Sequence, residues 1–435
     1  MEYTTRADWT KGWTPVSKLT ATEGMLVSLR NEDNPLTANG GVVTWGANNG
    51  LKLVDFILTD DNGNFIGVVD INDPQWDLLM DQVTLDEAIQ FLAYAGDDIE
   101  NIDSIGLPRT YANDGPVGFT ADQVNNYGMR WNAANSSEPT YVDGKGEYDG
   151  YSMAVFPTEP VVAATFNKEL VEREGELMGE QGLWANESSI FGPGLNLHRS
   201  PYCARNHEYY SEDSMLTNLL GVAVCKGGKS KGLMMEPKHF AFNHMEFNRF
   251  GVATYFNEQS GRENELRGFQ GAMSGNYAQG IMTCFNRVGS MFGGGHPGTH
   301  IQIARNEWGY TGWFVTDMVN GADYMNWRVV VANGGAGLLT SSAYEGSGIG
   351  KMEDSKSAIA ADEAFQLRMK QAIKYYAYTM AGSNAMNGIT SNTRMVYVRT
   401  WWQNAILAAE IGTAVLTVAF IALGVVGSLK KKKAN

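Results

Sequence analysis

Cysteine, positive charge and nucleotide-binding motifs are scarce or lacking in this chain, and each shortage narrows its possible functions. Only Cys203, Cys225 and Cys284 occur, with no CxxC and no cluster of His and Cys residues. An odd number of cysteines without such spacing indicates neither a disulfide framework nor a zinc site. We therefore expect no metal in this protein.

The shortage of positive charge argues against one class of partner. The chain has 33 Lys and Arg residues against 48 Asp and Glu residues, a formal net charge of −15. Nucleic acid requires a basic face to neutralise its phosphates, so we expect no nucleic-acid partner. No P-loop stands at a strand–helix turn, which disfavours the nucleotide-triphosphate folds.

A long hydrophobic run is present at the C-terminus. Residues 405–429 are almost wholly apolar, and residues 411–429 carry no charge. At ~1.5 Å per residue the uncharged stretch reaches roughly 28 Å, close to the hydrocarbon thickness of a bilayer. Trp401 and Trp402 precede the run and a lysine cluster follows it. The pattern predicts a transmembrane helix over 405–429 in contact with membrane lipid, and a basic tail at 430–435.

The lysine tail also predicts an orientation. The positive-inside rule places the tail in the cytoplasm and everything before it outside, as in a single-pass protein of the cell membrane. Yet the first residues, MEYTTRADWTKGW, contain no apolar segment of the kind that a signal peptide needs. Because a large extracellular domain is not exported without such a signal, we expect an upstream portion to supply it.

The chain is predicted to divide into several parts. Residues 1–74 alternate short β-like runs with Asn, Asp and Gly turns, which is typical of a linker or β-rich extension. A helical segment starts at Trp76, and within it Thr84 and Glu87 form a capping-box pattern. Residues 336–404 are polar and rich in Gly and Ser, and we interpret them as a connector with one amphipathic helix.

Strand-like and helix-like segments alternate through residues 75–335. This alternation indicates parallel βα units, and the predicted fold class is α/β, a (β/α)8 TIM-like barrel. In such barrels the functional residues lie at the C-terminal ends of the strands. The residues found where apolar runs end are Asp114, Arg205, Lys238, His239, Asn286 and Asp317.

Charged and amide side chains are unusually dense in residues 192–249. Because they are costly to bury without mutual pairing, they predict a polar pocket for a ligand rich in hydroxyl groups. At the end of the apolar run WFVTD, Asp317 fits a helix cap, an ion-pair partner or a nucleophile. Lys238 with His239 fits a metal or phosphate site or a donor pair, and Asp114 fits a turn. Together they suit glycoside hydrolysis, in which a carboxylate attacks an oxocarbenium-like centre.

Four motifs in the same order and spacing resemble the catalytic barrel of glycoside hydrolase family 3, of the β-glucosidase type. They are DGPVGF at Asp114, RSPYCARNHEYYSED at Arg199, KHFAFNHMEFNR at Lys238 and GYTGWFVTDM at Gly309. The resemblance implies that Asp317 is the nucleophile of a retaining mechanism, and that no metal or organic cofactor is needed. It also implies that the sugar hydroxyls are held by Asp114, Arg205, Lys238, His239 and Arg249.

The chain departs from the family pattern at two pocket positions. Phe285 stands where the family commonly has Tyr, and Met318 where it usually has Trp after the nucleophile. The resemblance implies that both residues line the substrate site. Asn286 or another donor is expected to replace the missing phenol. The aromatic surface that a Trp at position 318 would offer for stacking on the sugar is expected to come from Trp313, Tyr324 or Trp327.

The details of the lysine motif favour one branch of the family. An N-acetylglucosaminidase branch carries KHFPGHG, whereas this chain reads KHFAFNH, with His244 offset from that pattern. We therefore expect a β-glucosidase acting on terminal non-reducing β-D-glucosyl residues of oligosaccharides, or a β-xylosidase.

The resemblance also implies a second part of the active site. Family members of this type take the acid/base Glu from another α/β domain, which in permuted members precedes the barrel. We expect this chain to be the barrel half of a permuted, membrane-anchored enzyme, with an upstream domain or partner chain supplying the Glu. The alternative is a membrane-tethered barrel that binds sugar and has lost catalysis, which the two departures favour and the retained Asp317 disfavours.

Overall fold

The structure is a computed structural model, and its description is limited to part of the chain. It describes residues 20–29, 41–96, 98–119, 154–247, 249–319, 324–334, 336–339, 352, 355–394 and 401–434. The chain forms two compact units, Met1–Asn392 and Thr393–Asn435. Described residues on both sides of the predicted divisions at 74/75 and 335/336 pack within the first unit, so those boundaries do not coincide with separate cores.

The first described elements lie between residues 23 and 93. They are α1 (Glu23–Leu29), a 3-10 turn (Leu53–Phe56), β1 (Ile57–Thr59), β2 (Phe65–Val68), α2 (Gln75–Gln82) and α3 (Leu85–Ala93). The strands β1 and β2 pair as an antiparallel hairpin. The helical segment predicted from Trp76 is interrupted at Val83, which adopts an extended ψ of 140°. A new helix starts there because Thr84 and Glu87 form the predicted capping box.

Parallel pairing of short strands organises the centre of the large unit. Its strands are β4 (Thr110–Asp114), β5 (Ser189–Phe191), β6 (Met234–Met235), β10 (Phe314–Val315) and β11 (Ala336–Gly337). β4 pairs with β5, β5 with β6, and β10 with β11, all in parallel. Isolated parallel bridges, Phe240 to Thr283 and Met282 to Val315, connect β6 to β10 through residues 281–284. The carboxyl ends of these strands therefore meet at one edge.

The predicted (β/α)8 barrel is confirmed only in its parallel α/β character. In the described ranges β4 has an antiparallel neighbour, β3 (Asp98–Ile99), in place of another parallel strand. The other end of the ladder approaches the same region, since Leu338 N donates to Leu92 O. Eight parallel strands are not seen in the part of the chain that the structure describes. A further small sheet contains β7 (Ala253–Thr254), β8 (Arg287–Val288) and β9 (Met291–Phe292).

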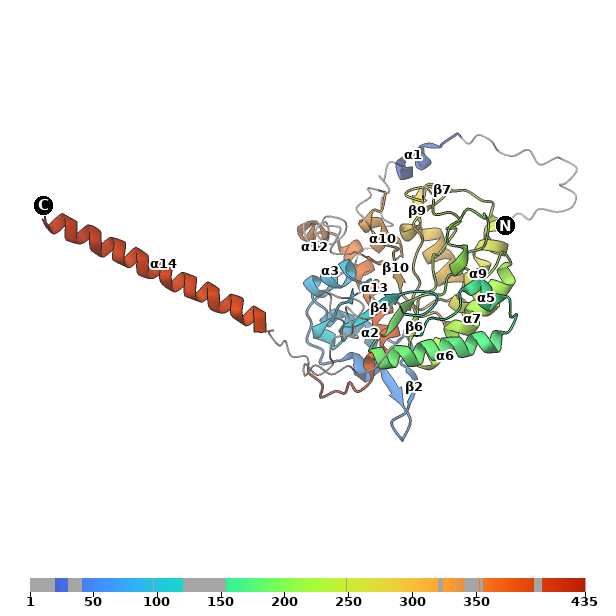
Figure 1. Cartoon of the computed structure of the whole chain (residues 1–435), viewed down its shortest axis with the longest axis horizontal. Coiled ribbons are helices and arrows are strands. Elements are labelled where there is room, and N and C mark those ends of the chain that lie inside the picture. Colours follow the sequence, from blue (N-terminus) through green and yellow to red (C-terminus); the bar gives the residue numbers. More distant parts are fainter. Residues whose placement is uncertain are drawn as a thin grey trace, which may run out of the picture. The chain divides into compact units, whose positions relative to one another are not determined.

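Helices surround the strands (Figure 1). The long helices α6 (Lys168–Ala185) and α7 (Ser214–Ser230) lie side by side, and α7 also contacts α9 (Arg267–Ser274). Gly175 allows the close approach of α6 to α7, because a Cβ there would lie 2.1 Å from Val224 O. The remaining described helices are α5 (Glu159–Ala163), α8 (Glu258–Ser260), α10 (Trp327–Gly334), α12 (Lys356–Ala360), α13 (Glu363–Ala381), two π-helices (Gly261–Glu265, Gly298–Glu307) and short 3-10 turns (Asp103–Ile105, Asn206–Glu208, Gly293–Gly295, Asn384–Met386).

The helix α13 lies in the region that the sequence analysis interpreted as a connector, and it belongs to the core. Its buried face includes Phe365, Ile373 and Tyr376. The Tyr376 ring stacks on that of Trp313 with centroids 4.7 Å apart, and its hydroxyl donates to Phe314 O at 3.0 Å. The helix therefore supports β10, the strand that leads to Asp317.

The second unit contains the long helix α14 (Trp401–Ala434). The part Trp401–Lys430 is long and apolar enough to cross a membrane, judged by length and composition alone, and its most apolar stretch is not buried in the structure. The hydroxyls of Thr413 and Thr417 donate to carbonyls one turn back, Ala409 O and Thr413 O. Such internal bonding lets a polar side chain tolerate lipid, and the membrane span stays a prediction.

Candidate active site

The predicted polar residues meet where the parallel strands end. Asp114 is the last residue of β4, Lys238 and His239 follow β6, and Asp317 follows β10. Lys238 Nζ lies 2.5 Å from Asp114 Oδ1, and His239 Nε2 lies 3.7 Å from Asp317 Oδ2. The placement agrees with the expectation that functional side chains lie at the carboxyl ends of strands.

Asp317 has two carboxylate oxygens in different surroundings. The backbone N–H of Met318 donates to Oδ1 at 2.7 Å. Oδ2 accepts no hydrogen bond from the described residues, although Arg249 Nη1 lies 3.8 Å and His239 Nε2 3.7 Å away. The residue is 8% exposed. One oxygen is therefore held by the backbone while the other is without a hydrogen bond and close to two donors.

The surroundings of Asp317 act on its pKa in opposite directions. Burial raises the pKa of this carboxyl above its ordinary value, because an ionised carboxylate loses hydration there. The positive charges of Arg249 and Arg205 and the N–H of Met318 act against that rise. These cations favour the ionised form, which is the form that can act as a nucleophile.

A chain of ion pairs surrounds this carboxylate. Glu208 accepts hydrogen bonds from Arg205 and lies 3.9 Å from Lys238 Nζ. Glu246 connects two arginines, since its carboxylate lies 3.5 Å from Arg205 Nη1 and 2.9 Å from Arg249 Nη1. The two glutamates thus position the cations that face Asp114 and Asp317. Burying several charges in one site is tolerable because each cation has a carboxylate nearby.

The ring of His239 is oriented by the tyrosine and asparagines around it. Burial and nearby cations hold its pKa well below the ordinary value, so the ring is neutral. The Tyr209 hydroxyl lies 3.3 Å from Nδ1 and itself accepts a hydrogen bond from Asn243 Nδ2. With that acceptor site filled, the hydroxyl donates to Nδ1, and the ring proton stays on Nε2, which faces Asp317. Asn196 also bonds both the N–H and the carbonyl of His239.

Phe285 and Met318 contribute to the site differently from the residues they replace. The guanidinium carbon of Arg249 lies 4.1 Å above the centre of the Phe285 ring, an arrangement in which the ring supports the cation. Asn286 does not substitute for the missing phenol, because its Nδ2 donates to Arg287 O and Thr254 Oγ1. The donor that reaches the carboxylate is instead the backbone N–H of Met318.

The three rings expected to supply a stacking surface for the sugar are engaged elsewhere. Trp313 is fully buried and donates through Nε1 to Glu236. Tyr324 donates its hydroxyl to Phe285 O, and Trp327 packs edge-on against Phe365. The expectation that one of them forms an open sugar-stacking surface is therefore not met by their positions.

Arg199 and His244 form a cluster separate from Asp317. Arg199 Nε donates to Glu265 Oε1 at 2.6 Å, and His244 Nε2 lies 2.7 Å from Glu265 Oε2. Both contacts lower the pKa of Glu265 against the effect of its burial. The reading of His244 as a residue outside the catalytic pattern is consistent with this structural pairing.

Three site residues were not selected from the sequence: Tyr209, Asn243 and Asn196. Glu208 and Glu246 belong to the dense charged stretch of residues 192–249, from which the polar pocket was predicted, but no role was assigned to them. A spacing signal indicated the partners of these two glutamates, because Glu208 follows Arg205 and Glu246 precedes Arg249 by three residues. No group of three or more His, Cys, Asp or Glu side chains suited to a metal ion occurs within the described ranges.

The fold and the site together define a class: an α/β protein with a cation-lined carboxylate at the carboxyl ends of parallel strands. The model of the glycosyl hydrolase family 3 N-terminal domain matches residues 141–331 of this chain. This match and the relatives below support glycoside hydrolase family 3 for that region of the chain. The matched range includes Lys238, His239 and Asp317, whereas Asp114 lies before it.

Curated relatives share this region at modest identity. A β-glucosidase of Ruminococcus albus is 29% identical over 218 residues, and thermostable β-glucosidase B of Acetivibrio thermocellus is 30% identical over 216 residues. Each alignment covers 50% of this chain but only 20% and 26% of those relatives. An exo-α-(1→6)-L-arabinopyranosidase of Bifidobacterium longum is 29% identical over 56% of this chain and 30% of its own length. The chain thus spans less than a third of these relatives.

Solved structures support the fold. β-Glucosidase 3B of Thermotoga neapolitana, in complex with α-D-glucose, has a TM-score of 0.59 at 24% identity, covering 69% of this chain and 41% of that one. A β-glucosidase of Paenibacillus barengoltzii has a TM-score of 0.62 at 21% identity, covering 83% of this chain and 37% of that one. The likeness shows a shared architecture.

Proposed function

We propose that this chain carries the nucleophile and the sugar-binding half of a retaining β-glycosidase, specifically a β-glucosidase. The observation that carries the proposal is the state of Asp317. One of its oxygens is held by Met318 N at 2.7 Å, while the other accepts no hydrogen bond from the described residues and is near Arg249 and His239. A buried carboxylate fixed at one oxygen and open at the other suits attack on an anomeric carbon.

In the proposed first step, Asp317 Oδ2 forms a bond to the anomeric carbon as the bond from that carbon to the leaving oxygen breaks. The leaving oxygen takes a proton from a general acid. In the second step water attacks the glycosyl ester, gives its proton to the same group and releases the sugar with retained configuration. Arg249 and His239 stabilise the carboxylate that departs in the second step.

The clamp for the sugar hydroxyls is proposed to be Asp114 with Lys238, and Arg205 with Glu208. Lys238 is 3% exposed at its side chain, whereas the Asp114 side chain is 49% exposed. The lysine thus positions a carboxylate that remains accessible to a ligand, and a carboxylate accepts well from vicinal hydroxyls. The names of two relatives, a β-glucosidase and an arabinopyranosidase, indicate that the family accommodates more than one pyranose. We propose glucose as the sugar because most of the relatives named above are β-glucosidases. The alternative activity is that of a β-xylosidase.

The acid/base Glu is proposed to come from an upstream domain or a partner chain. The helix α14 is proposed to anchor the barrel at the outer face of the cell membrane, with the lysine tail in the cytoplasm. Its long apolar stretch and the following lysines support this arrangement.

The test is covalent trapping with 2,4-dinitrophenyl 2-deoxy-2-fluoro-β-D-glucoside. The dinitrophenolate leaves with little acid assistance, so the reagent reports on the nucleophile without requiring the acid/base group. We expect peptide mass spectrometry to find one fluoroglucosyl group on Asp317, with labelling slowed by excess methyl β-D-glucoside. A folded chain that remains unlabelled, or that is labelled elsewhere, contradicts the proposal and favours a sugar-binding barrel without catalysis.

A second prediction concerns pH. The glycosylation step needs ionised Asp317, so its rate falls as the pH drops through the pKa of that carboxyl. Because the positive charge of Arg249 lowers this pKa, Arg249→Met should raise it and move the acid limb of the profile to higher pH. The measurement is the burst rate with 2,4-dinitrophenyl β-D-glucoside across the pH range.

The control for the pH prediction is Arg262→Met. Arg262 pairs with Glu258 and Glu307, away from Asp317. Its replacement should leave the acid limb in place. An acid limb that is unchanged in the Arg249 variant would show that another group controls it.

A further inference from the structure

A cavity lies at the opposite ends of the parallel strands from Asp317. It has a volume of about 260 Å³. Gln279 and Thr311 line the cavity. In the chain Gln279 comes just before the strand segment 281–284, and Thr311 comes just before β10. These strands run from the cavity toward Asp317, so the cavity is distinct from the candidate active site.

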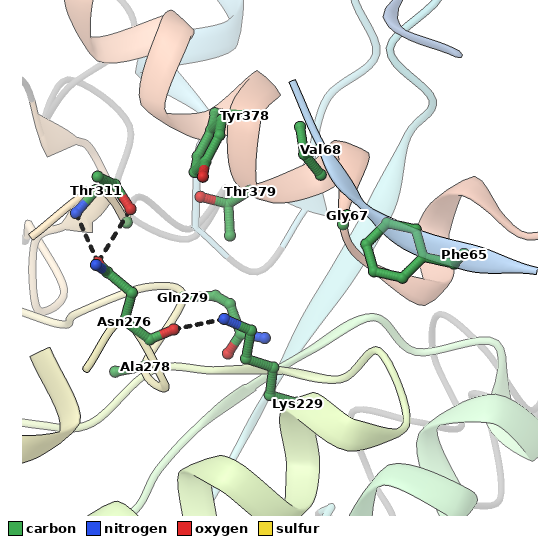
Figure 2. A pocket seen from close by; sticks show the side chains of 12 residues that line it. Phe65, Gly67, Val68, Lys229, Asn276, Ala278, Gln279, Thr311, Tyr378 and Thr379 are labelled. Carbon is green, nitrogen blue, oxygen red and sulfur yellow. Dashed lines mark hydrogen bonds between the residues drawn. The ribbon is translucent and has the colours of Figure 1, made fainter. Parts of the chain in front are cut away.

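Two aromatic side chains border this cavity (Figure 2). Phe65 comes from β2 of the hairpin and is 55% exposed, and Tyr378 comes from α13. A ring exposed to this degree on a short hairpin is not explained by packing in the core. An aromatic face at a cavity can cover the C–H surface of a flat ligand.

Two nitrogen donors also line the cavity, and their hydrogen-bonding capacity is only partly used. Gln279 is 7% exposed, and its Oε1 accepts from Met235 N, but its Nε2 donates to no atom in the described residues. Among the described residues Lys229 Nζ donates one hydrogen bond, to Asn276 O at 2.7 Å, although an ammonium has three protons. A buried amide with an unused donor normally has a partner.

The charge environment of Lys229 differs from that of its neighbours. Lys226 pairs with Glu172 at 2.8 Å and Lys231 with Glu180 at 2.6 Å. Lys229 has only the Asn276 carbonyl among the described residues, and burial lowers its pKa. The cavity therefore offers donors to an acceptor-rich ligand without a carboxylate that occupies them.

We propose that this cavity is a non-catalytic binding site for a single pyranose unit. A pyranose has hydroxyl oxygens that accept from Gln279 and Lys229 and a C–H face that covers the ring of Phe65. The volume is below the ~300–1,000 Å³ of sites for larger ligands, which fits one ring. A multiply charged anion fits less well, because one lysine is the only cation that lines the cavity among the described residues. The site does not depend on the proposed catalysis.

The test counts sugar-binding sites on the full chain. All variants carry Asp317→Asn to prevent turnover and are kept in a polyoxyethylene detergent, which has no sugar headgroup. Equilibrium dialysis with radiolabelled methyl β-D-glucopyranoside gives the number of sites per chain. The variants compared are Phe65→Ala and Gln279→Glu, and the control is Leu58→Ala, on the same hairpin but outside the cavity lining.

We expect Phe65→Ala to weaken the cavity site about tenfold or more. In Gln279→Glu the carboxylate replaces the N–H donors and pairs with Lys229, which should abolish binding there. Gln279→Glu should therefore bind one sugar fewer per chain than the Leu58→Ala control, and Phe65→Ala should bind the same sugar with a dissociation constant about tenfold higher or more. Equal stoichiometry and affinity in all three variants would overturn the inference.

The outcome also separates this inference from the proposed function. If both hold, the number of sites in Gln279→Glu falls from two to one, whereas it falls from one to zero if the site near Asp317 binds no glucoside. In either case the difference between the Phe65 variant and its control reports on the cavity alone. Phe65 is exposed on a hairpin, so its replacement is not expected to unfold the chain.

Discussion

Asp317→Ala should lower the rate of glycosyl transfer from 2,4-dinitrophenyl β-D-glucoside by a factor on the order of 10⁴ or more. The reason is that the variant keeps the cations around the site but lacks the atom that forms the bond to the anomeric carbon. Arg249 and His239 would remain within reach of the position of Oδ2. The measurement is the initial release of dinitrophenolate, followed at saturating substrate.

The variant also allows a stereochemical test of the role of Asp317. Its shortened side chain leaves space for a small anion, so added azide should restore dinitrophenolate release and give the α-glucosyl azide. Asp61→Ala, at an exposed position of the hairpin loop, is the control and should keep the full rate. A variant at position 317 that retains its rate without azide would show that another group is the nucleophile.

Asp114→Asn should lower kcat/KM for the same substrate by about 10²-fold. The carboxylate of Asp114 lies 2.5 Å from Lys238 Nζ and is itself accessible. An amide keeps the shape but loses the charge, so a sugar hydroxyl would bond to a weaker acceptor while the buried ammonium loses its close partner. Both effects are larger in the transition state, where hydroxyl contacts tighten.

The contribution of the pair can be separated from that of each partner. Lys238→Met and the double variant with Asp114→Asn complete a double-mutant cycle. Because the two side chains pair, the losses of kcat/KM in the two single variants should not add up in the double variant. Asp103→Asn is a matched change outside the site, in the short turn Asp103–Ile105, and should have no effect. Fully additive losses at 114 and 238 would show that the two side chains act independently on the substrate.

Local signals in the sequence were sufficient for several parts of the structure. The capping box at Thr84 formed as predicted because both halves of the interaction lie within one turn. The ends of β4 and β10 were recognisable because an apolar run stops at a carboxylate, at Asp114 and at Asp317. These features depend on neighbours in the chain, so they can be read without knowledge of the fold.

Other features depended on contacts between distant segments. The antiparallel β3 beside β4 and the burial of α13 against Trp313 could not be read from periodicity, which is the same for an exposed connector and a core helix. The orientation of His239 likewise depends on Tyr209 and Asn243, whose positions relative to the ring arise from folding.

The sequence by itself indicated the resemblance to the family, the set of charged residues and the candidate nucleophile, because these are carried by ordered motifs and by residue chemistry. Only the tertiary structure decided which groups meet. Glu246 lies between Arg205 and Arg249, Asn286 bonds away from Asp317, and the N–H of Met318 donates to Asp317. The physical reason is that side-chain pairing at a strand edge depends on the separation and direction of elements far apart in the chain. Periodicity and motif order describe each element alone.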